Sequence, residues 1–437
     1  GFSLFSKEVS YNVSHWETAG DLDGDQAYQD FLPAIMASEN DCEYYRTMQR
    51  FCALLKDGHT NVYLPEGLLE KYVGRVPLRV RELEHRAIVT NMDVSLAEDI
   101  PAGSEILEVD GQPVAEMVEK EIIPMISTSA PHIYWDMAVA SRKSAGVGIL
   151  FGEKGSTARL KIRRPEGEVI LVNVARDQYE RDVEWAEEVA KAPLIESRRL
   201  EGGIAYVALN SFSDVEIVEA FREKLPWLAG AKGILLDLRR NSGGSSLNAS
   251  AIVGHFTDEP FRGAAWRTPV NYGVYRAWGM YADSIEELEE YRDFYHGHVY
   301  HREEADELEP SKGTTLAVPT VVLIGRQTAS AAEDFLVMAD ELEAFTYLGE
   351  PTFGSTGQPL MMELPGGGSA RISTKRDFYP DGREFIGRGV QPDIEVKPTV
   401  EAFLNDRDEA LERAIAELKK KAAELGLSDS AVSVFQE

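Results

Sequence analysis

Three short apolar runs mark the second half of the chain. The runs 204–209, 233–238 and 321–324 are rich in β-branched residues and leucine, which is typical of buried strands. A Ser213-Asp-Val-Glu216 capping box after the first run predicts a helix that extends to about Leu225. Apolar residues at helical spacing over 335–342 predict another helix directly after the third run. Strand, helix and strand in this order indicate a parallel sheet with functional loops at the carboxyl ends of the strands.

The first half of the chain follows other patterns. Up to about Lys56 the apolar positions form a helical stripe, and from Pro77 the pattern changes to short strands. One strand is expected at 87–90, and 158–162 with 169–174 reads as a hairpin.

The last part of the chain predicts a hairpin of 360–364 with 370–374 and a charged amphipathic helix from Val400. We therefore divide the chain into an N-terminal helical region (1–72), a β-rich module (73–180) and an α/β domain (181–437).

Composition narrows the function classes. The chain has 437 residues, enough for two or three domains with substantial cores. Its 45 basic and 74 acidic residues give a net charge of −29, which argues against nucleic acid or an anionic membrane as a partner. No apolar run is long enough to span a bilayer. The first residues lack a basic start and an apolar core, so we expect a signal peptide to be absent or already removed. Cys42 and Cys52 are expected as free thiols.

Ser330 lies at the junction between the third apolar run and its helix. A serine at a sharp strand-to-helix turn is held beside free N–H groups and the positive end of the helix. The Ala331 N–H could then stabilise the oxyanion formed when Ser330 Oγ attacks a carbonyl. The same serine could instead only cap the helix, with Glu333 completing a capping box. This stretch alone favours the cap.

Two further segments carry candidate chemistry. The run 233–238 leads into Arg239-Arg-Asn-Ser-Gly-Gly-Ser245, and adjacent glycines let backbone N–H groups approach a ligand closely. An ordinary turn is the alternative. His59, in the stretch after the N-terminal helices, is either a catalytic base or a structural histidine.

Two stretches invite a metal interpretation. Asp21, Asp23 and Asp25 lack the EF-hand order and its distal Glu, so we prefer a turn with a helix cap. The segment 261–312 is aromatic and acidic, and we interpret it as a lid or one wall of a substrate cleft. Its histidines and neighbouring glutamates fit no structural zinc pattern: His296, His298, His301, Glu303 and Glu304. We expect no metal.

The segment 102–114, Ala-Gly-Ser-Glu-Ile-Leu-Glu-Val-Asp-Gly-Gln-Pro-Val, resembles the part of PDZ domains in which a strand leads through a tight turn into a helix. Such domains add an extended peptide to a sheet edge. An insertion at 124–152 interrupts the module, and no clear carboxylate-binding loop is found.

Six motifs in order resemble the C-terminal processing (tail-specific) serine peptidases, including the tricorn core protease and interphotoreceptor retinoid-binding protein. They are Gly58-His59-Thr60, the PDZ-like segment, Asp237-Leu-Arg-Arg-Asn-Ser-Gly-Gly244, Thr328-Ala-Ser-Ala-Ala-Glu333, Gly349-Glu-Pro-Thr-Phe-Gly354 and Gly389-Val-Gln-Pro-Asp393. The resemblance covers nearly the whole chain. It implies an α/β fold with a crotonase/ClpP-like catalytic core, a PDZ-like β-rich module and a helical N-terminal region.

The resemblance also implies a site, which we carry over residue by residue. It contains Ser330 as nucleophile, His59 as general base and Glu384 as the orienting glutamate, with Ala331, Gly243 and Gly244 as the oxyanion hole and Ser355, Thr356 and Gly357 as substrate-binding residues.

Two positions depart from the family pattern. One branch of the family uses a Ser–Lys dyad whose lysine follows the Phe-Gly of the Gly-Glu-x-Thr-Phe-Gly segment; here that position is Ser355, so the dyad is ruled out at its usual place. The other branch uses a histidine preceded by an orienting serine; here Gly58 precedes His59. An imidazole of pKa about 6.5 can take the proton of a serine hydroxyl near neutral pH, so we predict Ser/His chemistry.

The resemblance therefore implies a serine endopeptidase that cleaves unfolded or flexible polypeptides without a cofactor. Its partner would be the polypeptide substrate, its location extracytoplasmic, and a homo-oligomer stays open. A catalytically silent binding protein on the same scaffold is the alternative, favoured by Gly58, Ser355 and the segment 261–312. A crotonase-type thioester hydrolase fits less well, because no nucleotide pocket is recognisable and a PDZ-like module is present.

Overall fold

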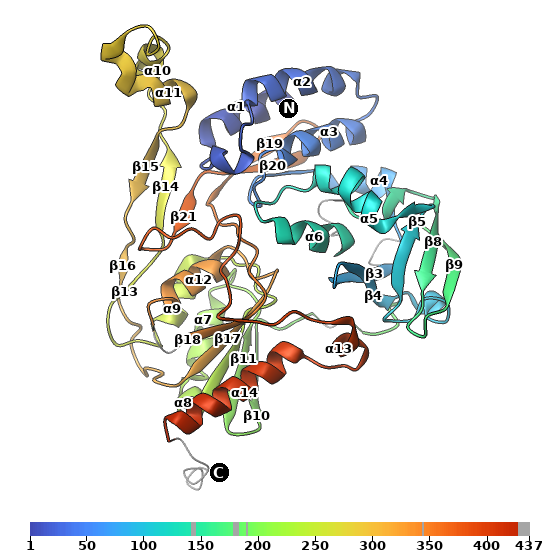
Figure 1. Cartoon of the computed structure of the whole chain (residues 1–437), viewed down its shortest axis with the longest axis vertical. Coiled ribbons are helices and arrows are strands. Elements are labelled where there is room, and N and C mark those ends of the chain that lie inside the picture. The colour runs from blue at the N-terminus through green and yellow to red at the C-terminus, as the bar shows by residue number, and fades with distance from the viewer. Residues whose placement is uncertain (141–145, 178–182, 189–190, 343–344, 427–437) are drawn as a thin grey trace. The chain divides into compact units, whose positions relative to one another are not determined.

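The chain forms two compact units in the computed structural model, which describes residues 1–140, 146–177, 183–188, 191–342 and 345–426 (Figure 1). Unit 1 consists of 1–189, 267–303 and 357–376, and unit 2 of 190–266, 304–356 and 377–437. The three-domain division at 72–73 and 180–181 remains a prediction, and its second boundary lies outside the described residues.

Unit 2 is built on a six-stranded sheet in the order β10-β11-β12-β17-β18-β22. The strands are β10 (Ile195–Leu200), β11 (Ile204–Leu209), β12 (Gly233–Asp237), β17 (Thr320–Ile324), β18 (Phe345–Gly349) and β22 (Ile394–Glu395). Strands β11 to β22 run parallel, and β10 pairs antiparallel with β11. The parallel sheet and its three central strands are therefore confirmed.

Both faces of this sheet are covered, so its central strands read as continuous apolar runs rather than alternating ones. One face packs against α7 (Glu216–Arg222), α8 (Leu225–Ala229), α9 (Ser246–Val253) and α12 (Ala331–Ala339). The other face packs against α14 (Glu409–Glu424), drawn red in Figure 1. Alternate residues of β11, such as Val207 and Tyr206, enter the two cores.

Two helix predictions in unit 2 need correction. The helix expected from Ser213 begins at Glu216 and ends at Arg222, because the Asp214 carboxylate, not the Ser213 hydroxyl, accepts the Glu216 N–H (3.0 Å). The single helix expected from Val400 is two helices, α13 (Val400–Leu404) and α14. Asp406, with φ 50°, turns the chain between them, and Asp408 caps α14 by accepting the Leu411 N–H (3.0 Å).

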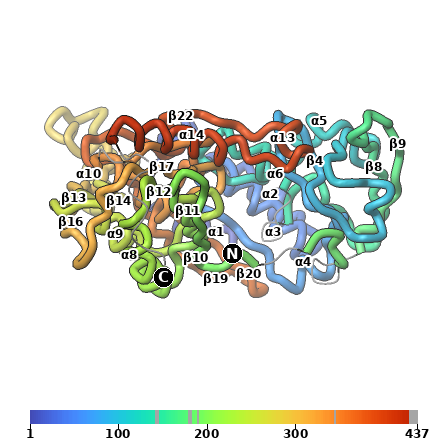
Figure 2. Tube along the Cα trace, turned by 90° about the horizontal axis from the view of Figure 1, so that it is seen from below, coloured from blue at the N-terminus to red at the C-terminus, as the bar shows by residue number. Residues whose placement is uncertain are grey.

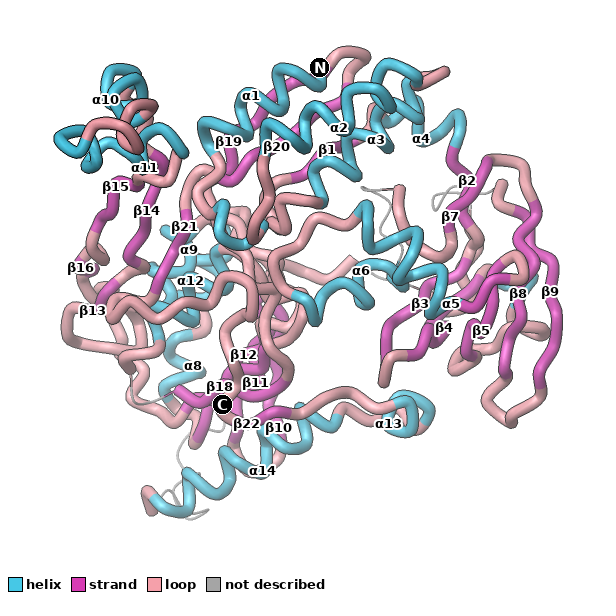
Figure 3. Tube along the Cα trace, turned by 45° about the horizontal axis from the view of Figure 1, so that its top comes forward, coloured by secondary structure: helices cyan, strands magenta, loops and turns pink. Residues whose placement is uncertain are grey.

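The N-terminal part of unit 1 is helical, as predicted. Helices α1 (Phe2–Asn12), α2 (Gly24–Ala37) and α3 (Asp41–Ala53) share one core with a small sheet ordered β1-β20-β19 (Figure 3). Its strands are β1 (Asn61–Tyr63), β19 (Pro359–Leu364) and β20 (Gly368–Ser373), and the β19–β20 hairpin confirms the prediction for 360–374. Asp23 caps α2 by accepting the Asp25 and Gln26 N–H groups, which confirms the cap preferred over a calcium loop.

A second sheet of unit 1 is ordered β3-β4-β5-β8-β9 around its own core. Its strands are β3 (Leu78–Leu83), β4 (Arg86–Met92), β5 (Glu105–Val109), β8 (Thr157–Arg163) and β9 (Val169–Ala175), with β6 (Gln112–Pro113) pairing β5 and helices α5 (Val114–Met117) and α6 (Tyr134–Ala140) beside them. Figure 2 shows β8 and β9 lying along each other, which confirms the predicted hairpin. Unit 1 also holds α4 (Glu66–Tyr72) and β2 (Val73–Arg75), which pairs with β7 (Phe151–Glu153).

The segment 261–312 forms paired strands and short helices: β13 (Phe261–Arg262), β14 (Ala265–Pro269), α10 (Gly273–Gly279), α11 (Arg292–His296), β15 (Tyr300–Glu303) and β16 (Glu307–Leu308). Within unit 1, Arg267 pairs with Glu17, and the Asn271 amide donates to the Tyr11 carbonyl (2.9 Å). The lid or cleft-wall interpretation of this segment remains a prediction. Across the described residues, no helix is both long enough and apolar enough to cross a membrane.

Candidate active site

Ser330 occupies a strained position at the turn from β17 into α12. Its backbone has φ 55° and ψ −125°, whereas a residue that only caps a helix has a β-region backbone. Such a conformation in a non-glycine residue costs on the order of 1–3 kcal/mol and persists only where its surroundings enforce it. Ser330 still begins α12, and the Glu333 carboxylate accepts its N–H (3.2 Å). Capping alone therefore does not account for this backbone geometry.

The surroundings that hold Ser330 come from neighbouring loops of unit 2. The Ser330 N–H also donates to the Ser355 carbonyl (3.3 Å), and the Ala329 N–H donates to the Asn241 carbonyl (3.1 Å). The Thr328 hydroxyl donates to the Leu238 carbonyl at the end of β12 (2.9 Å). Ser330 is thus tied to the loops that follow β12 and β18.

Glu333 is a fully buried carboxylate at the centre of these contacts. It accepts hydrogen bonds from the Ser330 N–H, the Gly354 N–H (2.7 Å), the Ser355 N–H (3.1 Å) and the Thr352 hydroxyl (2.5 Å). Burial raises its pKa to about 8, against these hydrogen bonds, which favour the ionised form. Sequence reasoning assigned Glu333 only to a capping box and missed that it also holds the loop 352–355.

The glycine turn after β12 lies against Ser330. Gly243 has φ 99°, and a methyl group added to it would lie 2.7 Å from Ser330 Cβ and 2.9 Å from the Ala331 nitrogen. Gly244 has φ 138°, and a methyl group added to it would lie 2.2 Å from the Ser213 nitrogen. Only glycine fits at these two positions. The structure therefore brings the predicted Gly243–Gly244 turn together with Ser330 and Ala331.

The N–H groups of this turn differ in their partners. The Gly243 N–H donates to the Asn241 side chain (2.9 Å). Within the part of the chain that the structure describes, neither the Gly244 N–H nor the Ala331 N–H donates a hydrogen bond. Of the predicted oxyanion residues, Gly244 and Ala331 are thus the ones with N–H groups available to an oxygen.

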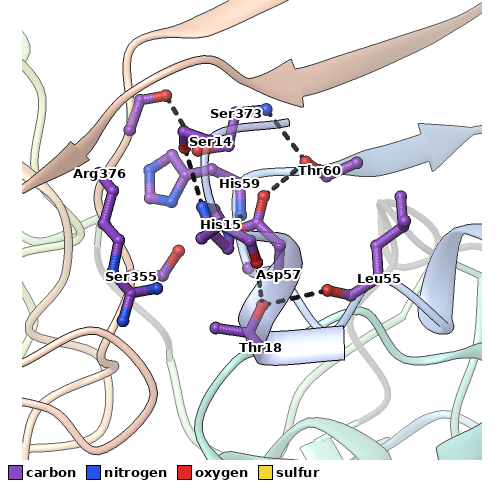
Figure 4. Close-up of polar contacts among 12 residues, drawn as sticks. Ser14, His15, Thr18, Leu55, Asp57, His59, Thr60, Ser355, Ser373 and Arg376 are labelled. Carbon is purple, nitrogen blue, oxygen red and sulfur yellow. Dashed lines mark hydrogen bonds and ion pairs between the residues drawn. The ribbon is translucent and has the colours of Figure 1, made fainter. Parts of the chain in front are cut away.

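His59 lies in unit 1, in the turn between α3 and β1, and is buried (Figure 4). Burial lowers its pKa to about 4; the nearby Arg371 acts in the same direction, and Asp57 opposes it. The imidazole is therefore neutral at pH 7 and able to accept a proton. Because His59 belongs to unit 1 and Ser330 to unit 2, their pairing remains a proposal.

The other predicted site residues have different environments. Glu384 is exposed on unit 2, and its carbonyl accepts the Arg388 Nε–H (2.7 Å). Ser355 and Thr356 are buried, and the Thr356 hydroxyl donates to Asp377 (2.5 Å). Gly357 belongs to unit 1, where a methyl group at its Cα would lie 2.0 Å from Ser373 Oγ.

The histidine-rich stretch of the segment 261–312 contains an ion pair. His301 Nε2 lies 2.6 Å from Glu303 Oε1, and both side chains are exposed. Among the described residues, no group of three or more histidine, cysteine, aspartate or glutamate side chains is arranged to hold a metal ion.

Comparison with known proteins relates this site to a family. The model of peptidase family S41 matches residues 203–396, which contain Ser330 and the glycine turn. The carboxy-terminal processing protease CtpA of Bacillus subtilis is 22% identical over 257 residues, covering 57% of this chain and 45% of the relative. The carboxyl-terminal-processing protease of a Picosynechococcus species is 22% identical over 365 residues, covering 82% and 73%.

The fold is similar to that of a solved structure over nearly all of the chain. The crystal structure of mature CPAF matches 99% of this chain and 98% of its own, with a TM-score of 0.72 at 16% identity. The chain spans less than half the length of the Bacillus subtilis relative, so these similarities concern the aligned part alone. Residues 203–396 thus match the model of peptidase family S41, and the chain is similar to the carboxy-terminal processing proteases.

Proposed function

We propose that this chain is a serine endopeptidase of the C-terminal processing type, which hydrolyses peptide bonds in unfolded or flexible polypeptides. The observation that carries the proposal is the strained Ser330 at the start of α12, with the backbone of Gly243 packed against it. Strain of this kind at a strand-to-helix turn exposes a nucleophilic hydroxyl above a sheet. The names of the aligned relatives support the same activity.

In this proposal Ser330 Oγ attacks the scissile carbonyl, and the resulting oxyanion accepts hydrogen bonds from the Ala331 and Gly244 N–H groups. Ala331 directly follows Ser330, and Gly244 directly follows Gly243, which packs against Ser330. The position of Ala331 at the first residue of α12 adds the positive end of the helix. Two preorganised donors lower the barrier by about 3 kcal/mol or more. Gly243 shapes the turn, while its own N–H is held by Asn241.

His59 is the proposed general base, giving Ser/His rather than Ser/Lys chemistry. A neutral imidazole can take the hydroxyl proton during attack and return it to the leaving amine. Ser355, at the position where one branch of the family has lysine, is buried, and its backbone holds Ser330 and Glu333. Glu384 is proposed to orient His59, and Ser355, Thr356 and Gly357 to line the substrate path.

In this proposal the two units have different roles. We interpret the α/β sheet of unit 2 as a crotonase/ClpP-like core, and the β3–β9 sheet of unit 1 as a PDZ-like module that docks an extended polypeptide. Helix α5 directly follows β6, and this order of strand, tight turn and helix supports the PDZ-like interpretation. The extracytoplasmic location is likewise proposed from the family resemblance.

The test is active-site labelling. The purified chain should react with a fluorophosphonate at Ser330 and cleave a reduced, unfolded polypeptide, and Ser330→Ala should abolish both. Ser250→Ala, on α9 of the same unit with its hydroxyl bonded to the Leu247 carbonyl, should leave both intact. His59→Gln should lower the cleavage rate by roughly 10²–10⁴-fold. If the wild-type protein neither labels nor cleaves, the chain is a binding protein on a peptidase scaffold.

A further inference from the structure

A buried carboxylate, Asp57, lies at the centre of the turn that carries His59. Its side chain is fully buried in unit 1. Asp57 Oδ1 accepts the His59 N–H (3.0 Å), and Oδ2 accepts the Thr60 hydroxyl (2.5 Å) (Figure 4). One carboxylate therefore holds both the backbone of His59 and the side chain of Thr60.

Asp57 is itself held by a second histidine from a distant part of the chain. His15, which follows α1 and is buried, places Nε2 3.2 Å from Asp57 Oδ1. The other ring nitrogen of His15 lies 2.9 Å from the Ser14 hydroxyl, which fixes the ring plane. Asp57 thus contacts both His15, in the N-terminal segment, and the backbone of His59 in its own turn.

The turn is also fastened to the β20 strand. The Ser373 N–H donates to the Thr60 hydroxyl (3.0 Å), and Arg371 Nη2 donates to the Gly58 carbonyl (3.0 Å). Gly58 therefore has an anchored backbone although it lacks the orienting side chain found in one branch of the family. The rigidity of the turn comes from Asp57 and β20 instead.

We propose that Asp57, braced by His15, is the positioning residue that holds His59 in the orientation needed to act as a base. This inference rests on the proposed function. Asp57 acts through His59 and contacts no substrate, so its loss should lower kcat more than it changes KM.

Because charged groups surround the turn, the role of Asp57 should be visible in the pH dependence of activity. The ionisable groups that act on His59 are Arg371 on β20, Asp57 and His15, and Cys52 on α3 lies close to Asp57 and Arg371. Burial alone would raise the pKa of the Asp57 carboxyl, but His15, His59 and Thr60 hold it well below its usual range. An ionised Asp57 favours protonation of His59, so neutralising it should move the pKa of His59 lower and make the imidazole a weaker base.

The decisive variant is Asp57→Asn, which keeps the shape of the side chain and an acceptor for the His59 N–H. We expect about tenfold slower labelling of Ser330 and about tenfold lower kcat with little change in KM. We also expect the acid limb of the pH profile of kcat/KM to move to lower pH by about half a unit. His15→Asn should change both quantities in the same direction.

The matched control is Asp23→Ala, which removes the N-cap of α2 in the same unit. It should lower stability without changing the labelling rate or the pH profile. Wild-type kinetics and an unmoved pH profile in Asp57→Asn would overturn the proposal.

Amide hydrogen exchange tests the same role without any activity. In Asp57→Ala the amides of 58–61 should exchange about tenfold faster or more than in wild type, while those of α2 stay protected. Asp23→Ala should show the reverse. An inactive wild-type protein would refute the proposed function alone, whereas unchanged exchange of 58–61 in Asp57→Ala would overturn the role of Asp57.

Discussion

Single residues set the geometry of the proposed nucleophile. Ser330 has a backbone that a helix cap does not need, and the contacts that hold it come from Glu333, Ser355 and the glycine turn. Glu333 is the most consequential of these, because its carboxylate joins the start of α12 to the loop 352–355. Two predictions follow from the space around Gly243 and the burial of Glu333.

Gly243→Ala should abolish labelling of Ser330 and destabilise the fold. The new methyl group would lie 2.7 Å from Ser330 Cβ and from the Ala329 carbonyl oxygen, and the backbone has φ 99°. Gly167→Ala is the matched control, because its φ of 95° is similar but nothing lies within 4 Å of the added methyl group. Both variants should lose about 1 kcal/mol from the backbone conformation, and only Gly243→Ala should also lose activity. Equal labelling rates for the two variants would contradict the packing seen at Ser330.

Glu333 should make the protein less stable as pH rises. Its pKa is raised from 4.5 to about 8, so the folded state binds the proton more tightly than the unfolded chain. The stabilisation is complete below the unfolded pKa of 4.5 and is lost as pH rises through about 8. Between about pH 5 and 8 the free energy of unfolding should fall by on the order of 3 kcal/mol.

Urea unfolding at both pH values should show this fall in the wild type and in Glu341→Gln, an exposed control in the same unit. Glu333→Gln should lack it. A Glu333→Gln variant that retains the wild-type pH dependence would assign the effect to another group.

At the scale of elements, an arginine after strand β12 forms an ionic contact with the residue that caps helix α14. Arg239, just after β12, donates from Nε and Nη2 to the Asp237 carboxylate and from Nη1 to Asp408, the N-cap of α14 (2.9 Å). One arginine thus links the central sheet to the helix on its second face. The pairing with Asp408 could not be assigned from the sequence, because Asp408 lies 169 residues away.

Arg239→Met should destabilise unit 2 by roughly 2–4 kcal/mol, since it leaves the buried Asp237 without its cationic partner. Arg407→Met is the control: Arg407 pairs with Glu412 on the surface, and exposed pairs contribute about 0–1 kcal/mol. Denaturant midpoints of the two variants provide the comparison. Similar losses in both would show that Arg239 contributes no more than a surface ion pair.

On the scale of the whole molecule, net charge should influence which polypeptides reach the proposed active site. The net charge of −29 creates a negative field that attracts basic chains and repels acidic ones. A lysine-rich unfolded polypeptide should therefore be cleaved with a higher kcat/KM than an acidic one of equal length. Raising the salt concentration from about 0.02 to 0.5 M should narrow the difference, because the Debye length shortens. A preference that salt leaves unchanged would point to local contacts instead.

The periodicity of apolar residues was sufficient to predict the strands and helices in which that periodicity is strongest. The buried runs of β11, β12 and β17, the hairpin of β8 and β9 and the N-terminal helices were all predicted, because each buries a regular set of side chains that neighbouring residues reveal. Helix boundaries were less accurate at Ser213 and after Val400. There, the side chains of Asp214 and Asp408 accept hydrogen bonds from nearby backbone N–H groups and decide where a helix begins. A capping pattern in the sequence does not show whether Ser213 or its neighbour Asp214 forms such a bond.

Local patterns thus settled which segments become strands and helices and which serine begins α12, because those properties depend on neighbouring residues. Tertiary packing decided that Ser330 has a strained backbone and that Glu333 is buried. It also decided that the Gly243 N–H is bonded to Asn241, which leaves Gly244 as the available donor of the turn. The contact of His15 with Asp57 is of the same kind, since 42 residues separate them and their close approach depends on how α1 and α3 pack. Burial and long-range hydrogen bonds have no signature in local sequence, because they depend on what the rest of the chain places nearby.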